Sequence, residues 1–190
     1  MKRTLVILVV LTLLLLGCGQ AFAGTIDYYE TADVFYMFDN MQSRGVVTIN
    51  VWADTKNVFC DEGGYCFNSG QAKLHIAGLD LNLSEVVLVQ LSTRFGDVEF
   101  FDNRTSALIW GTVSAALKSY DLKGYFATIT GLPLPSSGPG GSFETDGGLF
   151  QIDGFPTGKA SFGAAIPEPG SLSLLAAFGL ITMGLVRRKS

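Results

Sequence analysis

Histidine, cysteine and positive charge are scarce in this chain, and the motifs that many enzymes carry are missing. A single histidine, His75, occurs among the 190 residues, so a histidine-based triad or zinc site has only one imidazole available. The sequence contains no Gly-x-Ser-x-Gly elbow, HExxH motif, phosphate-binding loop or dinucleotide fingerprint. We therefore expect a protein that is not an enzyme, with His75 as an ordinary strand residue.

Acidic residues outnumber basic ones, with 17 Asp and Glu against 13 Lys and Arg. Five of the basic residues and one acidic residue lie within the first 23 and the last 24 positions. The segment between them keeps eight basic and 16 acidic residues, a net charge of −8. An acidic body repels nucleic acid and anionic lipid head groups, so we expect no nucleic-acid partner.

The N-terminus has the three parts of a secretory signal peptide. Lys2 and Arg3 are basic, residues 5–16 are apolar except for one threonine, and Ala21-Phe22-Ala23 offers the small residues that signal peptidase reads. The apolar core is about a dozen residues, whereas a membrane span needs roughly 20. We expect residues 1–23 to be a signal peptide cleaved after Ala23.

A competing cleavage site lies within the same segment. Leu15-Leu16-Gly17-Cys18 resembles the lipobox of bacterial lipoproteins. That resemblance implies lipidation of Cys18, which would become the new N-terminus and make the protein an outer-membrane lipoprotein. Lipidation of Cys18 therefore stays open as an alternative to cleavage after Ala23.

The C-terminus is a second export-related segment. Residues 172–186 are an apolar run of 15 positions, which as a helix is about 22 Å long against a hydrocarbon core of about 30 Å. The basic residues Arg187, Arg188 and Lys189 follow at once, and such clusters stay on the cytoplasmic side. We expect a short transmembrane helix that anchors the chain marginally, with the body outside.

Two prolines precede this run and shape the junction. Pro167 and Pro169 fix their own backbone angles and push the residue before each toward extended geometry. Glu168 lies between them, in an extended segment of the kind that a protease accepts.

Together, these features of residues 166–190 closely resemble the PEP-CTERM sorting signal of exported Gram-negative bacterial proteins. The resemblance implies recognition by exosortase, a membrane enzyme thought to act as a cysteine transpeptidase, with cleavage near Pro167-Glu168-Pro169. It also implies export across the inner membrane, transient anchoring and a final place at the cell surface or in the extracellular matrix. Proteins with this signal are common in bacteria that make exopolysaccharide and live in biofilms or flocs.

The body, residues 24–165, alternates β-rich runs with turn clusters at spacings of about 10 to 15 residues. This pattern predicts a single all-β domain, a β-sandwich or a jelly roll. Residues 132–142, rich in Pro, Gly and Ser, are expected to form a loop, and 113–120 one or two helical turns. The clearer strand candidates are 46–53, 73–77, 85–92, 97–101, 107–113 and 124–130, and the weaker ones are 33–39, 143–145, 149–152 and 160–165.

Two cysteines remain in the body. Cys60 and Cys66 enclose five residues that include Gly63-Gly64, which lets the chain turn back on itself. In an oxidising compartment we expect a Cys60–Cys66 disulfide. Metal binding by these cysteines is not expected, since a zinc site needs four ligands.

Several acidic residues cluster near expected turns. Asp61-Glu62, Asp97 with Glu99, and Asp102-Asn103 are candidates for calcium binding, because hard cations prefer oxygen ligands, although no EF-hand spacing occurs. Asp97 and Glu99 fall on one strand face, as a glycosidase pair would, but such pairs are frequent by chance. We expect no cofactor and keep calcium as an open alternative.

These patterns favour a non-enzymatic exported surface or exopolysaccharide-matrix protein that signal peptidase and exosortase process. The alternative is an exported module that binds carbohydrate or calcium. An exposed Trp52 or Trp110 on a flat face would favour carbohydrate binding, whereas two carboxylates about 5–10 Å apart in a groove would favour hydrolysis.

Overall fold

The structure, a computed structural model, describes residues 24–134 and 141–166. Within them Gly24–Ile166 forms one compact unit. No α-helix occurs in this part of the chain; the short 3₁₀ turns are η1 (Thr55–Asn57) and η2 (Ala115–Ser119), the latter within the expected helical turns. The all-β prediction is confirmed.

The strands are β1 (Thr25–Phe38), β2 (Met41–Asp54), β3 (Phe59–Cys60), β4 (Tyr65–Ile76), β5 (Leu79–Asn82), β6 (Val87–Ser92), β7 (Asp97–Asp102), β8 (Leu108–Val113), β9 (Phe126–Leu134), β10 (Ser142–Thr145), β11 (Gly148–Gly154) and β12 (Ala160–Ala165).

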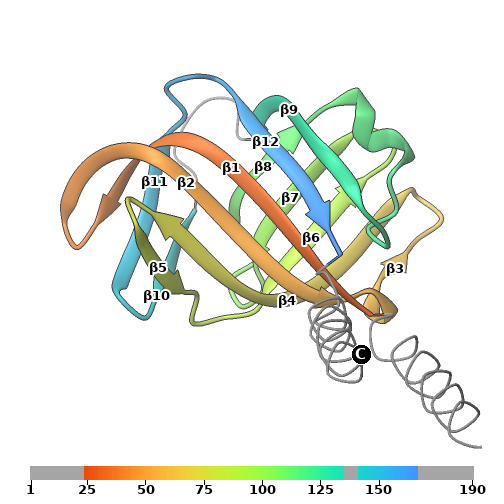
Figure 1. Cartoon of the computed structure of the whole chain (residues 1–190), viewed down its shortest axis with the longest axis horizontal. Coiled ribbons are helices and arrows are strands. Elements are labelled where there is room, and N and C mark those ends of the chain that lie inside the picture. Colours follow the sequence, from red (N-terminus) through yellow and green to blue (C-terminus); the bar gives the residue numbers. More distant parts are fainter. Residues whose placement is uncertain (1–23, 135–140, 167–190) are drawn as a thin grey trace, which may run out of the picture. The chain divides into compact units, whose positions relative to one another are not determined.

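Eight of these strands close into an antiparallel barrel (Figure 1). Their order is β1-β12-β9-β8-β7-β6-β4-β2, and β2 pairs with β1 along all 14 residues, from Thr25↔Asp54 to Phe38↔Met41. The sheet therefore closes on itself, whereas the sandwich and the jelly roll that we expected have two separate sheets. Closure removes the free edges at which a sheet is prone to pair with other chains.

Because β1 and β4 are longer than their neighbours in the barrel, their far ends pair with further strands, β11 and β5, which with β10 form a side branch of the sheet. The first half of β1 pairs with β12 and the second half with β11, with a register shift between Phe35 and Tyr36. β4 likewise pairs with β6 over Tyr65–Gly70 and with β5 further along. A bridge between Leu83 and Thr145 joins the end of β5 to β10. The strands β5, β10 and β11 thus extend the sheet beyond the barrel (Figure 1).

The expected loop 132–142 is partly wrong, because β9 continues to Leu134 and β10 begins at Ser142. Pro133 lies in β9 opposite Thr112, near the end of the β8–β9 pairing, where a missing backbone N–H is tolerated. Strand content was underestimated elsewhere too, since β1 begins at Thr25 and β4 at Tyr65, before the expected runs 33–39 and 73–77.

Large apolar side chains fill the barrel. They come from alternate positions of the strands, and the largest fully buried ones include Trp110, Tyr28, Phe100, Phe150 and Phe162. Leu117 and Leu122, from the segment around η2, are also completely buried. The hydroxyl of Tyr28 donates to the backbone carbonyl of Leu122 and accepts from the Asn68 side chain.

Both ends of the body leave the barrel at the same end. β1 and β12 are antiparallel neighbours with Asp27 opposite Ala165, so the start of the first strand lies beside the end of the last. β12 ends at Ala165, two residues before Pro167, where the expected sorting motif begins.

Candidate functional site

A continuous outer face runs across β3, β4, β6 and β7. The pairing of these strands aligns Phe59 with Phe67, Phe67 with Gln90, and Gln90 with Glu99. Neighbouring positions such as Cys66, Val89 and Val98 are buried, so the aligned side chains point away from the core. We call Phe59, Tyr65, Phe67, Gln90 and Glu99 the aromatic–amide face.

Three aromatic rings lie side by side on this face. The Phe67 ring is in the middle, with its centroid 6.5 Å from that of Phe59 and 6.4 Å from that of Tyr65. The corresponding interplanar angles are 19° and 22°, so the three rings are nearly parallel. Phe59 is 64% exposed. Tyr65 and Phe67 are partly buried, so Phe59 supplies most of the exposed apolar surface here. Exposed apolar surface of this kind usually marks a contact site.

Polar groups continue the row beyond the rings. Gln90 Nε2 donates to Glu99 Oε2 over 3.1 Å, which holds the amide and the carboxylate side by side. Burial, together with the nearby negative charge of Asp97, raises the pKa of Glu99 above its usual value. Burial also raises the pKa of Asp97. Asp97 and Glu99 therefore share one strand face, as their spacing predicted, and both are partly withdrawn from water.

A shallow depression of about 210 Å³ adjoins Gln90. Leu88 and Phe101 are cross-strand partners on β6 and β7 and supply an apolar wall, while the other lining residues supply two amides, a carboxylate and a hydroxyl. The lining residues are Leu88, Gln90, Phe101, Asp102, Asn103 and Ser106. The depression thus shares Gln90 with the aromatic–amide face and extends it.

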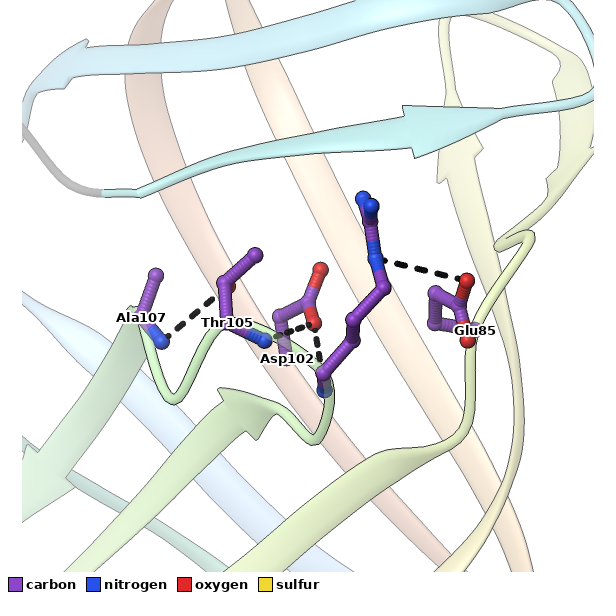
Figure 2. Close-up of polar contacts among 5 residues, drawn as sticks. Glu85, Asp102, Thr105 and Ala107 are labelled. Carbon is purple, nitrogen blue, oxygen red and sulfur yellow. Dashed lines mark hydrogen bonds and ion pairs between the residues drawn. The ribbon is translucent and has the colours of Figure 1, made fainter.

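The turn after β7 contributes Asp102, Asn103 and Ser106 to the lining of the depression. Figure 2 shows the polar contacts of this turn. Asp102 Oδ1 accepts hydrogen bonds from the backbone N–H groups of Arg104 (2.8 Å) and Thr105 (3.0 Å), as aspartates commonly do in turns. Thr105 Oγ1 accepts from the N–H of Ala107 over 3.3 Å, and Arg104 Nε lies 3.4 Å from Glu85 Oε1. The Asp102 carboxylate therefore mainly holds the backbone of the turn.

The arrangement suits a ligand with both apolar faces and hydrogen-bonding groups. Flat aromatic faces bind flat apolar surfaces, and a few convergent amide, hydroxyl and carboxylate groups fix orientation. No His, Cys, Asp or Glu group of three that could hold a metal ion occurs in residues 24–134 and 141–166. The acidic residues proposed for calcium therefore do not form a three-ligand cluster there.

The expected disulfide is confirmed, since Cys60 and Cys66 are bonded and lie opposite each other in the β3–β4 hairpin. In the turn between them, Asp61 Oδ1 accepts from the N–H of Tyr65 over 2.8 Å. This aspartate, one of the calcium candidates, therefore stabilises the turn.

His75 is a partly exposed residue on β4, and its Nδ1 forms a hydrogen bond with Asp80 Oδ1 in the β4–β5 hairpin. The two tryptophans do not form a shared platform. Trp110 is completely buried in the barrel, whereas Trp52 is partly exposed on β2, with Lys73 Nζ 5.9 Å from the ring centre. The condition that would have favoured carbohydrate binding through tryptophan is therefore not met by Trp110, and the rings that lie together on the surface are those of Phe59, Tyr65 and Phe67.

The predicted processing residues lie outside the described part of the chain. This applies to the cleavage site at Ala23 and the lipidation candidate Cys18. It applies equally to the sorting motif Pro167, Glu168 and Pro169, to the basic residues Arg187, Arg188 and Lys189, and to the expected helix 172–186. Among the residues that the structure does describe, no helix is both long and apolar enough to cross a membrane.

The aromatic–amide face was not predicted, although part of its signal is present in the sequence. Phe59 precedes Cys60 and Phe67 follows Cys66. If the disulfide joins two antiparallel strands at directly opposite positions, the residues flanking it must also face each other. The contribution of Gln90 and Glu99 depends on the pairing of β4 with β6 and of β6 with β7, which local sequence does not reveal.

No family model matches the chain, and no curated protein matches it. Among solved structures, a DUF1329 family protein from Desulfovibrio piger is similar at 8% sequence identity, with a TM-score of 0.14 over 80% of this chain and 88% of that chain. A TM-score this low carries no argument about fold or function.

Proposed function

We propose that this chain is a non-enzymatic exported protein of the cell surface or extracellular matrix. Signal peptidase removes residues 1–23, and exosortase recognises residues 166–190 and cleaves at Pro167-Glu168-Pro169. The body, a disulfide-linked β-barrel, is then left at the surface or within exopolysaccharide. The sequence of the two ends carries this proposal, because each contains a complete export or sorting signal in order.

The architecture of the body supports this proposal. Gly24–Ile166 is a compact unit with its own core, and its limits coincide with the two expected processing sites. β1 and β12 place the first and last residues of the barrel next to each other. Both terminal segments have basic residues on the flanks that we expect to stay in the cytoplasm, so the body between them would be exported.

Carbohydrate binding is the second candidate function, and the exposed Phe59 ring with the Phe67 and Tyr65 rings beside it favours it. Calcium binding has no comparable support in the described residues. Lipidation at Cys18 would change the anchor, and the body would be the same in either case.

Deletion of residues 167–190 tests the sorting proposal. We expect the truncated protein to be released into the periplasm or medium with no surface retention, because it lacks both the membrane segment and the cleavage motif. Cell fractionation with immunoblotting measures this. A truncated protein that fractionates like the full chain would contradict the proposal.

Two matched variants separate sorting from lipid anchoring. Replacement of Pro167, Glu168 and Pro169 by alanine should leave an uncleaved form of higher mass, because the extended motif is lost while the apolar segment remains. Cys18→Ser should leave retention unchanged if cleavage follows Ala23. The intact mass of the mature protein fixes both ends, and a lipid-modified N-terminal cysteine would support the lipoprotein alternative instead.

A further inference from the structure

We propose that the aromatic–amide face, together with the adjoining depression, binds an uncharged polysaccharide chain. This inference rests on the proposed function, since it assigns a ligand class to a protein that would reside in exopolysaccharide. The site consists of the rings of Phe59, Phe67 and Tyr65, the Gln90–Glu99 pair, and the depression lined partly by Phe101 and Asn103.

The aromatic rings are the first observation that supports binding of a sugar chain. A pyranose ring has one or both faces made of C–H groups, and such a face stacks on an aromatic ring while the hydroxyl groups point sideways. Phe59 is 64% exposed, so its ring is accessible to such a sugar face. The Phe67 ring lies beside it at a centroid distance of 6.5 Å, and the Tyr65 ring lies a further 6.4 Å along β4, so apolar surface continues next to Phe59.

The hydrogen-bonding groups beside the rings are the second observation that supports binding of a sugar chain. Gln90 and Glu99 form a hydrogen-bonded amide–carboxylate pair in the same cross-strand row as Phe59 and Phe67. From β3 to β7 the row crosses three strand spacings, about 14 Å at about 4.8 Å each. A short stretch of sugar chain can therefore lie across the strands, with hydroxyl groups reaching Gln90 and Glu99. The depression next to Gln90 has room for a further sugar or a branch.

Charge decides which polysaccharide fits. The body has a net charge of −8, and Asp97 and Glu99 lie on the outer surface of β7, Glu99 within the site itself. A polyanion such as nucleic acid or a uronic-acid polymer would be repelled. An uncharged polymer pays no such cost, and its hydroxyl groups donate to carboxylates in charge-assisted hydrogen bonds.

Affinity electrophoresis of the purified, oxidised body, residues 24–166, tests this inference. The body can be used alone because it is a closed barrel with its own core and disulfide. Native gels contain dextran, hydroxyethyl cellulose or galactomannan as uncharged probes, and alginate as the acidic probe. We expect retardation by at least one uncharged probe and none by alginate. Failure with all three uncharged probes, or retardation by alginate alone, overturns the inference.

Variants localise the site. Phe59→Ala should weaken binding at least tenfold, and Glu99→Gln severalfold, because one removes a stacking surface and the other a charged acceptor. Phe35→Ala is the matched control, because Phe35 is also an exposed phenylalanine, 41% accessible, but lies near the β1–β2 turn, outside the proposed site. The Phe35→Ala variant should bind like the unmodified protein. Unchanged melting temperature and an intact disulfide show that each variant is folded. Equal binding by Phe59→Ala and the unmodified body would overturn the assignment.

The same samples distinguish a protein partner from a glycan. If the face joined two copies of this chain, size-exclusion chromatography would show a dimer that Phe59→Ala converts to a monomer, and this result would also overturn the inference. The assay needs no sorting signal, so a binding result is independent of the fractionation of the 167–190 deletion. Failure here with normal processing would leave the proposed sorting intact.

Discussion

At the scale of single residues, Glu30 is a carboxyl group inside the barrel. It is fully buried on β1, and its Oε1 accepts a hydrogen bond from Thr112 Oγ1 over 2.7 Å. Its Oε2 has no partner among the described residues. Burial, and to a smaller degree the negative charge of Glu99, raises the pKa of Glu30 well above its usual value, despite the opposing hydrogen bond from Thr112. The group is therefore held in its protonated form in the folded protein as pH rises above the usual glutamate range.

Glu30 makes stability depend on pH in a defined direction. Its folded pKa is higher than its unfolded pKa near 4.5, so its contribution is fully present below pH 4.5 and is lost as pH rises toward the folded pKa. In that window the free energy of unfolding should fall by up to about 1.4 kcal/mol per pH unit for this one proton. Urea unfolding between pH 4.5 and 9 measures the slope.

Glu30→Gln is the control for that measurement, since glutamine keeps the shape of the side chain and cannot ionise. The variant should show a smaller loss of stability with pH than the unmodified protein. Asp27, Asp97 and Glu99 also have raised pKa values and remain in both proteins, so their contribution cancels in the comparison. Identical pH profiles for the two proteins would show that Glu30 does not titrate in this way.

At the scale of elements, β4 connects the barrel to its side branch. Its first half, Tyr65–Gly70, pairs with β6, and its second half pairs with β2 and β5. Gly70 lies at the change of partner, opposite both Ala53 and Val87. A Cβ atom there would come within 2.0 Å of the backbone carbonyl oxygen of Trp52. A residue without a side chain is therefore needed where β2 and β4 meet.

Gly70→Ala should destabilise the body by about 3 kcal/mol, the upper end of typical overpacking costs, because the clash is with backbone. Gly154→Ala is the matched control, since a Cβ at this position at the end of β11 would meet no atom within 4 Å. We expect the control to change the free energy of unfolding by less than about 0.5 kcal/mol. Chemical denaturation compares the two, and equal stability would contradict the role given to Gly70.

The β3–β4 hairpin is the second element with a testable role. The Cys60–Cys66 bond closes a short loop and holds the two-residue strand β3, which carries Phe59. Loop-closure entropy predicts that replacement of both cysteines by serine lowers the free energy of unfolding by about 2 kcal/mol. Dithiothreitol should destabilise the unmodified protein and leave the double variant unchanged. An effect of reductant on the double variant would show that the loss has another cause.

At the scale of the whole molecule, the pairing that closes the sheet determines where the two ends of the body and the aromatic–amide face lie. Pairing of β1 with both β2 and β12 brings the two ends of the body together, and pairing of β6 with β4 and β7 assembles the aromatic–amide face. Residues 59 and 99 become part of one surface although 40 positions separate them in sequence. The acidic surface charge then selects against anionic ligands across the whole body.

Local sequence determined most of the strands. The alternation at 46–53 predicted the C-terminal half of β2, and the predicted strand 160–165 coincides with β12. Both were predictable because a strand with one buried face places apolar residues at every second position. The disulfide was predictable because only two cysteines remain in the body and a flexible pair of glycines lies between them.

Tertiary structure alone decided the barrel and the composition of its outer face. A sandwich and a barrel share the same alternation, and the difference is whether the first and last strands pair, which depends on register between segments more than 100 residues apart. Burial of Trp110 and exposure of Phe59 follow from that closure, because the same aromatic residue type is core on one face of a strand and contact surface on the other.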